Sequence, residues 1–336
     1  MTSATHRSDH EAPLTGARRA EAIAAVRRQV SADGLNHADG AYALLRGLLL
    51  LAALAPTTVL VLSTGTWWAW TVHVVVAPGV LCTLPSVYHE CTHGNLSRSR
   101  PLNDAVGTIA GALHLTPFAT WRYFHLAHHA NTGTDDDPEV YPALWSRWTM
   151  LSFPLAQWSF IRILWEWTVA AIRGGGPIWV RSERQRAAIR VNALVTVLFW
   201  LALAAVAVLD IRVVGLLVVP SVLSLMVASL TLVPEHFPAY RVGPGPADQL
   251  DRTSTFRSNA VLRLVLWNSN YHAAHHFAPK VPAHHLGTID GMLSGIQDPR
   301  WRWTGYVRWY RERLRQLSWT PLDITAPEAP VKTGAR

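Results

Sequence analysis

The sequence contains few charged residues and very little lysine or cysteine. Charged side chains make up 15% of its 336 residues and hydrophobic ones 50%, whereas about a quarter of the residues of a soluble globular protein are charged. This composition argues against a soluble enzyme. The two cysteines, Cys82 and Cys91, are too few for a disulfide framework, and we expect both thiols to be reduced.

The basic residues are nearly all arginine, and they outnumber the acidic ones. The formal net charge is +8, and the two lysines are Lys280 and Lys332. Nucleic-acid binding would require these charges on one face together with a recognition motif; the sequence shows no such motif, so we expect no nucleic-acid partner. Contact with anionic lipid explains the basic balance better. The N-terminus has no apolar stretch directly behind its basic residues, which argues against a signal peptide.

Four long apolar runs, arranged in two pairs, account for the hydrophobic composition. Each run approaches the roughly 20 residues that cross a bilayer, and together they cover about residues 42–63, 67–88, 189–209 and 213–233. The two runs of each pair are separated only by a short turn, so each pair predicts a helical hairpin. Trp67, Trp68 and Trp70 lie where an aromatic belt at the membrane interface is expected. Residues 102–118 and 148–172 are less apolar and are predicted to be helices near the interface.

The distribution of arginine predicts how the runs are oriented. The turns of the two hairpins carry a single basic residue, Arg212, whereas the N-terminus, residues 94–187 and the C-terminal third contain almost all other arginines. By the positive-inside rule, both termini and every histidine cluster are cytoplasmic. We therefore predict an integral membrane protein of the bacterial-type inner membrane. It would consist of a polar segment (1–40), a membrane domain (41–320) and a tail (321–336).

Three clusters of histidines follow the apolar runs. The segment WRYFHLAHHAN places His125, His128 and His129 at positions i, i+3 and i+4, so their imidazoles share one face of a helix. The same HxxHH spacing recurs near the C-terminus, and an i, i+4 pair precedes both. The eight histidines are His89, His93, His125, His128, His129, His272, His275 and His276. Because imidazole is the commonest metal ligand in proteins, the repeated boxes predict a metal site.

The number of histidines indicates which kind of metal site this is. Eight neutral imidazoles exceed the four ligands of a tetrahedral zinc but suit two metals with open positions. The segment His89–His93 also matches HExxH, the zinc metalloprotease signature, with Glu90 as general base. That alternative, an intramembrane protease, leaves both HxxHH boxes unexplained. Iron would indicate the first interpretation and a single zinc the second.

The three boxes and their order resemble those of the membrane-bound fatty acid desaturase and hydroxylase superfamily. The resemblance covers about residues 40–290, and the segment PFATWRYFHLAHHANTGTDDDPE is characteristic of that family. With the apolar runs, it implies an all-α membrane protein with four transmembrane helices in two hairpins and a cytoplasmic helical cap. The cap would hold two non-haem irons on the eight box histidines. In that family the irons activate O2 to remove hydrogen from an unactivated C–H bond.

The resemblance also suggests further ligands near the metals. Similar members often supply a histidine between the second hairpin and the last box, and here His236 is the one in that interval. Asn268, one helical turn before His272 on the same face, is a candidate for holding a metal-bound water. Nearby carboxylates could orient the imidazoles or be solvated charges and helix caps; they are Glu90, Asp104, Asp135, Asp136, Asp137, Glu139 and Glu235. The remaining histidines, His73 and His114 among them, are expected to have structural or surface roles.

The predicted reaction is O2-dependent desaturation of a fatty acyl or lipid-like substrate. The alternative is hydroxylation or ketolation of a lipid or isoprenoid of the carotenoid type at the same site, because the outcome depends on how a C–H bond is held. The chain shows no haem-binding segment or flavin motif. Electrons are therefore expected from a separate donor, a ferredoxin or a cytochrome with its reductase.

Overall fold

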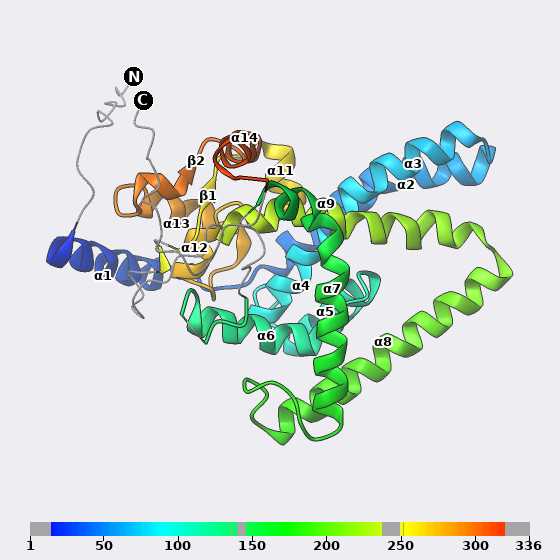
Figure 1. The fold of residues 1–336 in the computed structure, drawn as a ribbon, viewed down its shortest axis with the longest axis horizontal. Coiled ribbons are helices and arrows are strands. Elements are labelled where there is room, and N and C mark those ends of the chain that lie inside the picture. Colours follow the sequence, from blue (N-terminus) through cyan, green and yellow to red (C-terminus); the bar gives the residue numbers. More distant parts are fainter. Residues whose placement is uncertain (1–14, 135, 140–145, 237–248, 251, 320–336) are drawn as a thin grey trace.

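A computed structural model describes residues 15–134, 136–139, 146–236, 249–250 and 252–319 of the chain. In this part of the chain the secondary structure is almost entirely helical (Figure 1). The helices are α1 (Gly16–Ala32), α2 (Gly40–Thr64), α3 (Trp67–Leu81), α4 (Leu84–His93), α5 (Arg100–Leu113), α6 (Phe118–Asn131), α7 (Arg147–Ile172), α8 (Glu183–Leu209), α9 (Val219–His236), α11 (Ala260–Val265), α12 (His272–Phe277), α13 (Leu286–Leu293) and α14 (Tyr306–Gln316). Two short strands, β1 (Thr255–Phe256) and β2 (Arg302–Trp303), pair in parallel.

Four helical segments are long and apolar enough to cross a membrane. They are Gly40–Thr64, Trp67–His93, Glu183–Leu209 and Val214–His236. The four predicted spans are therefore confirmed as candidates by length and composition. α2 and α3 pack along each other and join at a turn where Gly65 takes a positive φ of 62°, a conformation that costs glycine little.

The second pair of spans does not pack along its length as the first pair does. α8 and α9 meet near residues 210–213 but diverge from there as an open V (Figure 1). α9 packs chiefly against α3 and α7, whereas α8 packs against α5, α6 and α7. The sequence could not predict this, because apolar runs of equal length give no information about which neighbour each helix contacts.

Polar side chains and a glycine hold α3 to its neighbours. His73 is completely buried; its Nδ1 lies 3.0 Å from Thr57 Oγ1 of α2, and its Nε2 lies 3.0 Å from the carbonyl oxygen of Leu216. Gly215 faces the indole of Trp70, and a Cβ at this position would come within 2.5 Å of that ring. Hydrogen bonds and small residues are the usual means by which helices associate in lipid. His73 therefore has the structural role expected for it.

The first histidine pair lies on a helix of its own. The second apolar run is interrupted at Cys82 and Thr83, and the chain resumes as α4, with Pro85 in its first turn, where the missing N–H is tolerated. α4 packs closely against α5. The interruption separates the box helix from the long apolar part of the span.

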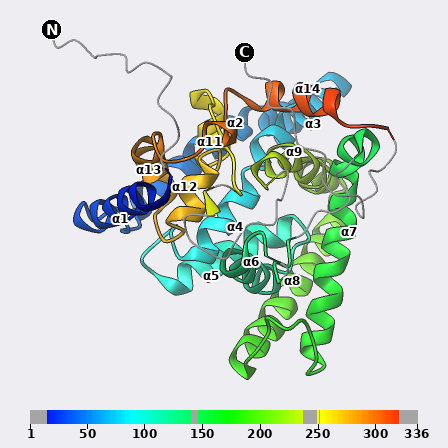
Figure 2. The same cartoon turned by 60° about the vertical axis from the view of Figure 1, so that its left-hand side comes forward.

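The second box helix, α6, is anchored by close contacts on several sides. Gly107 and Gly111 of α5 leave room for Phe118, since a Cβ on Gly107 would come within 2.2 Å of that ring. Asn192 of α8 accepts a hydrogen bond from the backbone N–H of Ala119. These contacts join α6 to α5 and α8. Figures 1 and 2 both place α4, α6 and α12 side by side in the middle of the molecule.

Candidate metal centre

The three helices that carry the histidine boxes converge, and they bring nine histidines together. Each box lies on one helix as predicted: the first on α4, the second on α6 and the third on α12. The ninth histidine, His236, is the last residue of α9. Their ring nitrogens form two neighbouring groups.

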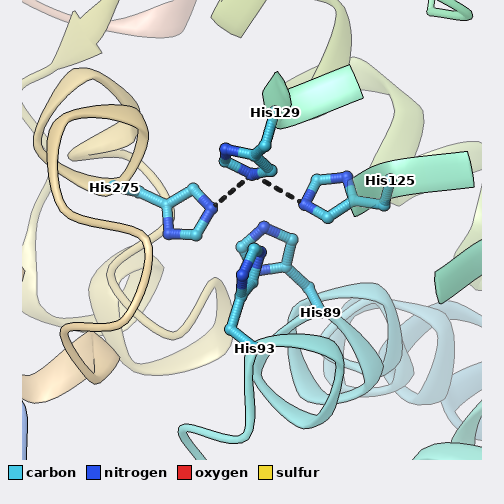
Figure 3. A group of neighbouring side chains, drawn as sticks. All are labelled: His89, His93, His125, His129 and His275. Carbon is cyan, nitrogen blue, oxygen red and sulfur yellow. Dashed lines mark hydrogen bonds between the residues drawn. The ribbon is translucent and has the colours of Figure 1, made fainter. Parts of the chain in front are cut away.

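The first group contains five histidines whose ligand atoms all lie within 4.8 Å of one another. Its members are His89, His93, His125, His129 and His275. Figure 3 shows the five rings pointing toward a common centre. His129 Nε2 lies 3.0 Å from the Nε2 atoms of both His125 and His275. Helices far apart in the sequence therefore contribute to a single nitrogen-lined space.

The second group contains His128, His236 and His276, whose ligand atoms are also within 4.8 Å of one another. His272 adjoins them, with its Nε2 2.6 Å from His236 Nε2 and 3.1 Å from His276 Nε2. In each HxxHH box the i, i+4 pair belongs to one group and the middle histidine to the other. The α6 pair, His125 and His129, lies in the first group, and the α12 pair lies in the second.

The protonation and hydrogen bonding of these imidazoles fit a pair of bound metal ions. Burial, with smaller effects from neighbouring imidazoles, lowers the pKa of His125, His129 and His275 well below the usual range, so these rings are neutral and offer a lone pair. The buried Nε2 atoms of His89 and His93 in the first group, and of His128 in the second, have no hydrogen-bond partner among the described residues. Buried polar atoms are seldom left unpaired in folded proteins. A bound cation in each group would satisfy them.

Two carboxylates orient His128 from outside the second group. Asp137 Oδ1 lies 2.8 Å from His128 Nδ1, and Glu139 Oε2 lies 3.5 Å from the same atom. Burial alone would lower the pKa of His128, but Glu139 and Asp137 outweigh it and raise that pKa. Asp137 also accepts hydrogen bonds from the backbone N–H groups of Gly133 and Glu139. Its geometry is that of a carboxylate that fixes the tautomer of a ligating histidine.

Other predicted carboxylates occupy different places. Glu235 Oε2 lies 3.3 Å from His272 Nδ1. Glu90 accepts a hydrogen bond from the backbone N–H of Ala283, and its Oε1 is 3.9 Å from His89 Nδ1. Asp104 instead pairs with Arg122, and Asp136 is exposed. Asp135 lies outside the described residues.

The structure corrects the expected position of Asn268. α11 ends at Val265 and α12 begins at His272, so Asn268 is not one helical turn before His272. It lies in the connection with a φ of 57°, and its side-chain Nδ2 donates to the carbonyl oxygen of Ala283. Its amide is thus engaged with the backbone, and a role in holding a metal-bound water stays a prediction.

A narrow cavity of about 80 Å³ borders both histidine groups. His89 and His125 of the first group and His236 and His272 of the second line it. Its remaining wall is largely aromatic and aliphatic, with Trp121, Phe124, Phe153, Phe160, Ile161 and Leu225 among the lining residues. The Trp121 ring stacks on His125 at 4.7 Å.

These wall residues carry no motif that marks them in the sequence. The spacing of Phe153, Gln157, Phe160 and Ile161 on α7 is helical, so a single face of that helix could have been recognised. The spacing does not show, however, that this face borders the histidines rather than lipid.

A comparison with protein families adds to this geometry. The family described as "Fatty acid desaturase" matches residues 65–303, which include all nine histidines. The chain belongs to the fatty acid desaturase family.

Individual members of the family are similar to the chain over shorter segments. A "Fatty acid desaturase" of Bacillus subtilis (strain 168) is 26% identical over 238 residues, which cover 63% of this chain and 64% of that protein. An "sn-1 acyl-lipid omega-3 desaturase (ferredoxin)" of Synechocystis is 31% identical over 88 residues, 26% of this chain and 24% of that protein. An "Acyl-lipid (9+3)-(E)-desaturase" of Dimorphotheca sinuata is 40% identical over 73 residues, 22% and 19% respectively. The matches thus span less than two thirds of these relatives.

Proposed function

We propose that the protein is an O2-dependent desaturase with two iron ions, which introduces a double bond into a fatty acyl or lipid-like chain. The observation that carries this proposal is the pair of buried histidine groups bordering one apolar cavity. A group of five imidazoles beside a group of four suits two metals better than a single tetrahedral zinc. One ion would be held by His89, His93, His125, His129 and His275, and the other by His128, His236, His272 and His276.

The irons would supply the O2 chemistry that protein side chains lack, since breaking an unactivated C–H bond requires a redox cofactor. In the overall reaction, two hydrogens leave adjacent carbons of the substrate, and O2 is reduced to two waters. The substrate provides two of the four electrons, and a donor must provide the other two together with two protons from solvent. We propose a separate donor, a ferredoxin or a cytochrome with its reductase; the Synechocystis relative carries "ferredoxin" in its name.

The contribution of the protein is to hold the substrate chain beside both metal groups. The aromatic and aliphatic wall of the cavity would exclude water and pack against methylene groups. Trp121 connects this wall to the metal centre because its ring stacks on His125 and also lines the cavity. Two neighbouring carbons held there would lie next to histidines of both groups.

We further propose that both termini and the metal centre lie on the cytoplasmic side of an inner membrane. In this arrangement two pairs of spans carry a helical cap, within a membrane domain of residues 41–320 flanked by a polar segment (1–40) and a tail (321–336). The arginine distribution supports this orientation, since both turns between the spans are nearly free of basic residues. The family match over residues 65–303 falls within the proposed membrane domain.

The HExxH protease alternative has weaker support. A metalloprotease would use Glu90 as a general base, but this carboxylate is buried and accepts a hydrogen bond from the N–H of Ala283. His89 and His93 moreover share their group with three further histidines.

Lipid analysis tests the proposed reaction. The protein and an inactive His129→Ala variant would be expressed in a host without desaturases, and the extracted lipids and carotenoids compared by mass spectrometry. We expect a product two hydrogens lighter than its precursor in the wild-type cells alone. A product heavier by one oxygen would instead indicate a hydroxylase, and a product that gains oxygen and loses two hydrogens would indicate a ketolase.

A further inference from the structure

We propose that an exposed basic face at one end of the molecule is the docking surface for a small, acidic, one-electron carrier protein. This basic face consists of Arg27, Arg28, Arg98, Arg100 and Lys280, all of which are exposed. The inference rests on the proposed function, because it concerns the electrons that this reaction needs. The basic face would be the place where these electrons enter the protein.

The residues of the basic face come from three segments that contact one another. The Arg27 guanidinium lies over the ring of Phe277, 5.3 Å from its centroid. Asn95 donates hydrogen bonds to backbone carbonyls of the loop that contains Lys280. Arg98 Nε donates to the carbonyl oxygen of Ala38, in the connection that follows α1. α1, the loop after α4 and the loop after α12 therefore form one surface.

Two of these three segments directly follow metal-site histidines. The loop with Arg98 begins after His93, the last residue of α4, and ends at Arg100, the first residue of α5. Phe277 follows His276 and is buried in the core that α1 helps to form. A partner bound over Arg27 would thus lie above Phe277, the residue that follows His276 in the chain.

The charges of this surface favour an acidic partner. Arg28, Arg100 and Lys280 have no ion-pair partner among the described residues. The carboxylates close to these residues in the chain are Glu21, Asp33, Asp39 and Asp104. Asp33 accepts a hydrogen bond from Gln29, Asp39 caps the first turn of α2, and Asp104 pairs with Arg122. A surface with an excess of one sign steers partners of the opposite sign and raises their association rate.

The position of the basic face favours a protein over a lipid surface. In Figure 1, α1 lies at the far left, at the opposite end of the molecule from the two turns between the candidate spans. The other strongly basic helix, α14, lies against the membrane-spanning part, since Tyr310 donates to the carbonyl oxygen of Leu230 in α9. Anionic headgroups would therefore meet α14, which leaves the face around α1 free for a soluble protein.

The scarcity of lysine makes the docking site directly testable. Carbodiimide couples a carboxylate to a lysine amine in contact with it, and the two lysines of the chain are Lys280 and Lys332. The intact, iron-loaded protein in nanodiscs would be treated together with an acidic [2Fe–2S] ferredoxin, and cross-linked peptides mapped by mass spectrometry. We expect the cross-link at Lys280, and its loss in Lys280→Arg, which keeps the charge. Cross-links confined to Lys332 or to the terminal amine would overturn the proposal.

Charge reversal provides a second readout. In the triple variant Arg28→Glu, Arg100→Glu and Lys280→Glu, we expect the KM for ferredoxin to rise about tenfold at low salt, with the difference shrinking as salt screens the charges. Turnover driven by dithionite and a small mediator dye should stay unchanged. The matched control reverses three exposed arginines around the connection between α7 and α8, Arg173, Arg181 and Arg184, and should leave that KM unaltered.

The outcomes separate the docking site from the reaction. An unchanged ferredoxin KM in the triple variant, or an equal rise in the control, would contradict the docking site. Loss of binding to phosphatidylglycerol vesicles with normal ferredoxin kinetics would reassign the face to lipid. A wild-type protein that turns over with neither electron source would refute the desaturase proposal, whereas the cross-link at Lys280 would still report docking.

Discussion

At the scale of single residues, the division of each HxxHH box between two groups explains why the box contains three histidines. The i, i+4 pair of such a box reaches one group and the middle histidine reaches the other, so α6 and α12 would each bind both metals. His236 completes the second group from a different direction, because it comes from the end of a candidate span. The two groups are therefore tied together by shared helices.

We predict that His236→Ala loses iron and activity together. His236 Nε2 lies 2.6 Å from His272 Nε2 in the second group, so its removal would leave that metal with three imidazoles. Metal analysis of the purified variant measures its iron content, and a turnover assay measures its activity. His114→Ala is the matched control, since His114 is also buried but bonds to Ser224 outside both groups. A His236→Ala protein that keeps its iron and activity would show that eight histidines suffice.

A second prediction concerns the carboxylate that contacts His128. Asp137→Asn removes the charge that favours the Nδ1–H tautomer of His128, and loss of such an outer partner typically costs 10–100-fold in metal affinity or activity. We therefore expect iron to dissociate about tenfold more readily in the presence of a chelator. The neighbouring Asp136→Asn, at an exposed position, should behave like wild type. Equal iron retention in the two variants would argue against the orienting role.

At the scale of elements, the close approach of α5 and α6 positions the second box. Gly111→Ala would place a Cβ within 2.9 Å of the carbonyl oxygen of Thr116, and backbone atoms cannot move aside as a flexible side chain can. Overpacking of this kind costs typically about 1–3 kcal/mol. We expect a lower midpoint of thermal unfolding in detergent.

Gly291→Ala is the control for this substitution. It lies within helix α13 with open space around the position of its Cβ, so alanine should leave stability unchanged or raise it through helix propensity. A Gly111→Ala protein as stable as the Gly291→Ala protein would show that α5 and α6 can separate without cost.

The elements also show how far the sequence could predict the structure. Hydropathy predicted the four candidate spans and histidine spacing predicted the three box helices, because both depend on local periodicity. The open V of α8 and α9 and the turn at Asn268 could not be predicted, since they depend on contacts between distant segments. Gly215 against Trp70 is one such contact. The assignment of each histidine to a group likewise required the relative positions of α4, α6 and α12.

At the scale of the whole molecule, the orientation in the membrane is the next prediction. Reporter tags at residues 1, 180 and 336 should all be cytoplasmic. The cysteines introduced by Thr64→Cys and Asp210→Cys should react with membrane-impermeant reagents added on the opposite side of the membrane. The native thiols, Cys82 and Cys91, are buried, so background labelling should be low. Labelling of either engineered cysteine from the cytoplasmic side would contradict the four-span arrangement.

The metal content of the purified protein tests the central claim most directly. The protein would be purified in mild detergent from iron-replete cells, and its metals counted by elemental mass spectrometry against protein from amino-acid analysis. Two histidine groups predict about two irons per chain and no stoichiometric zinc. One zinc per chain without iron would contradict the account and favour the HExxH alternative.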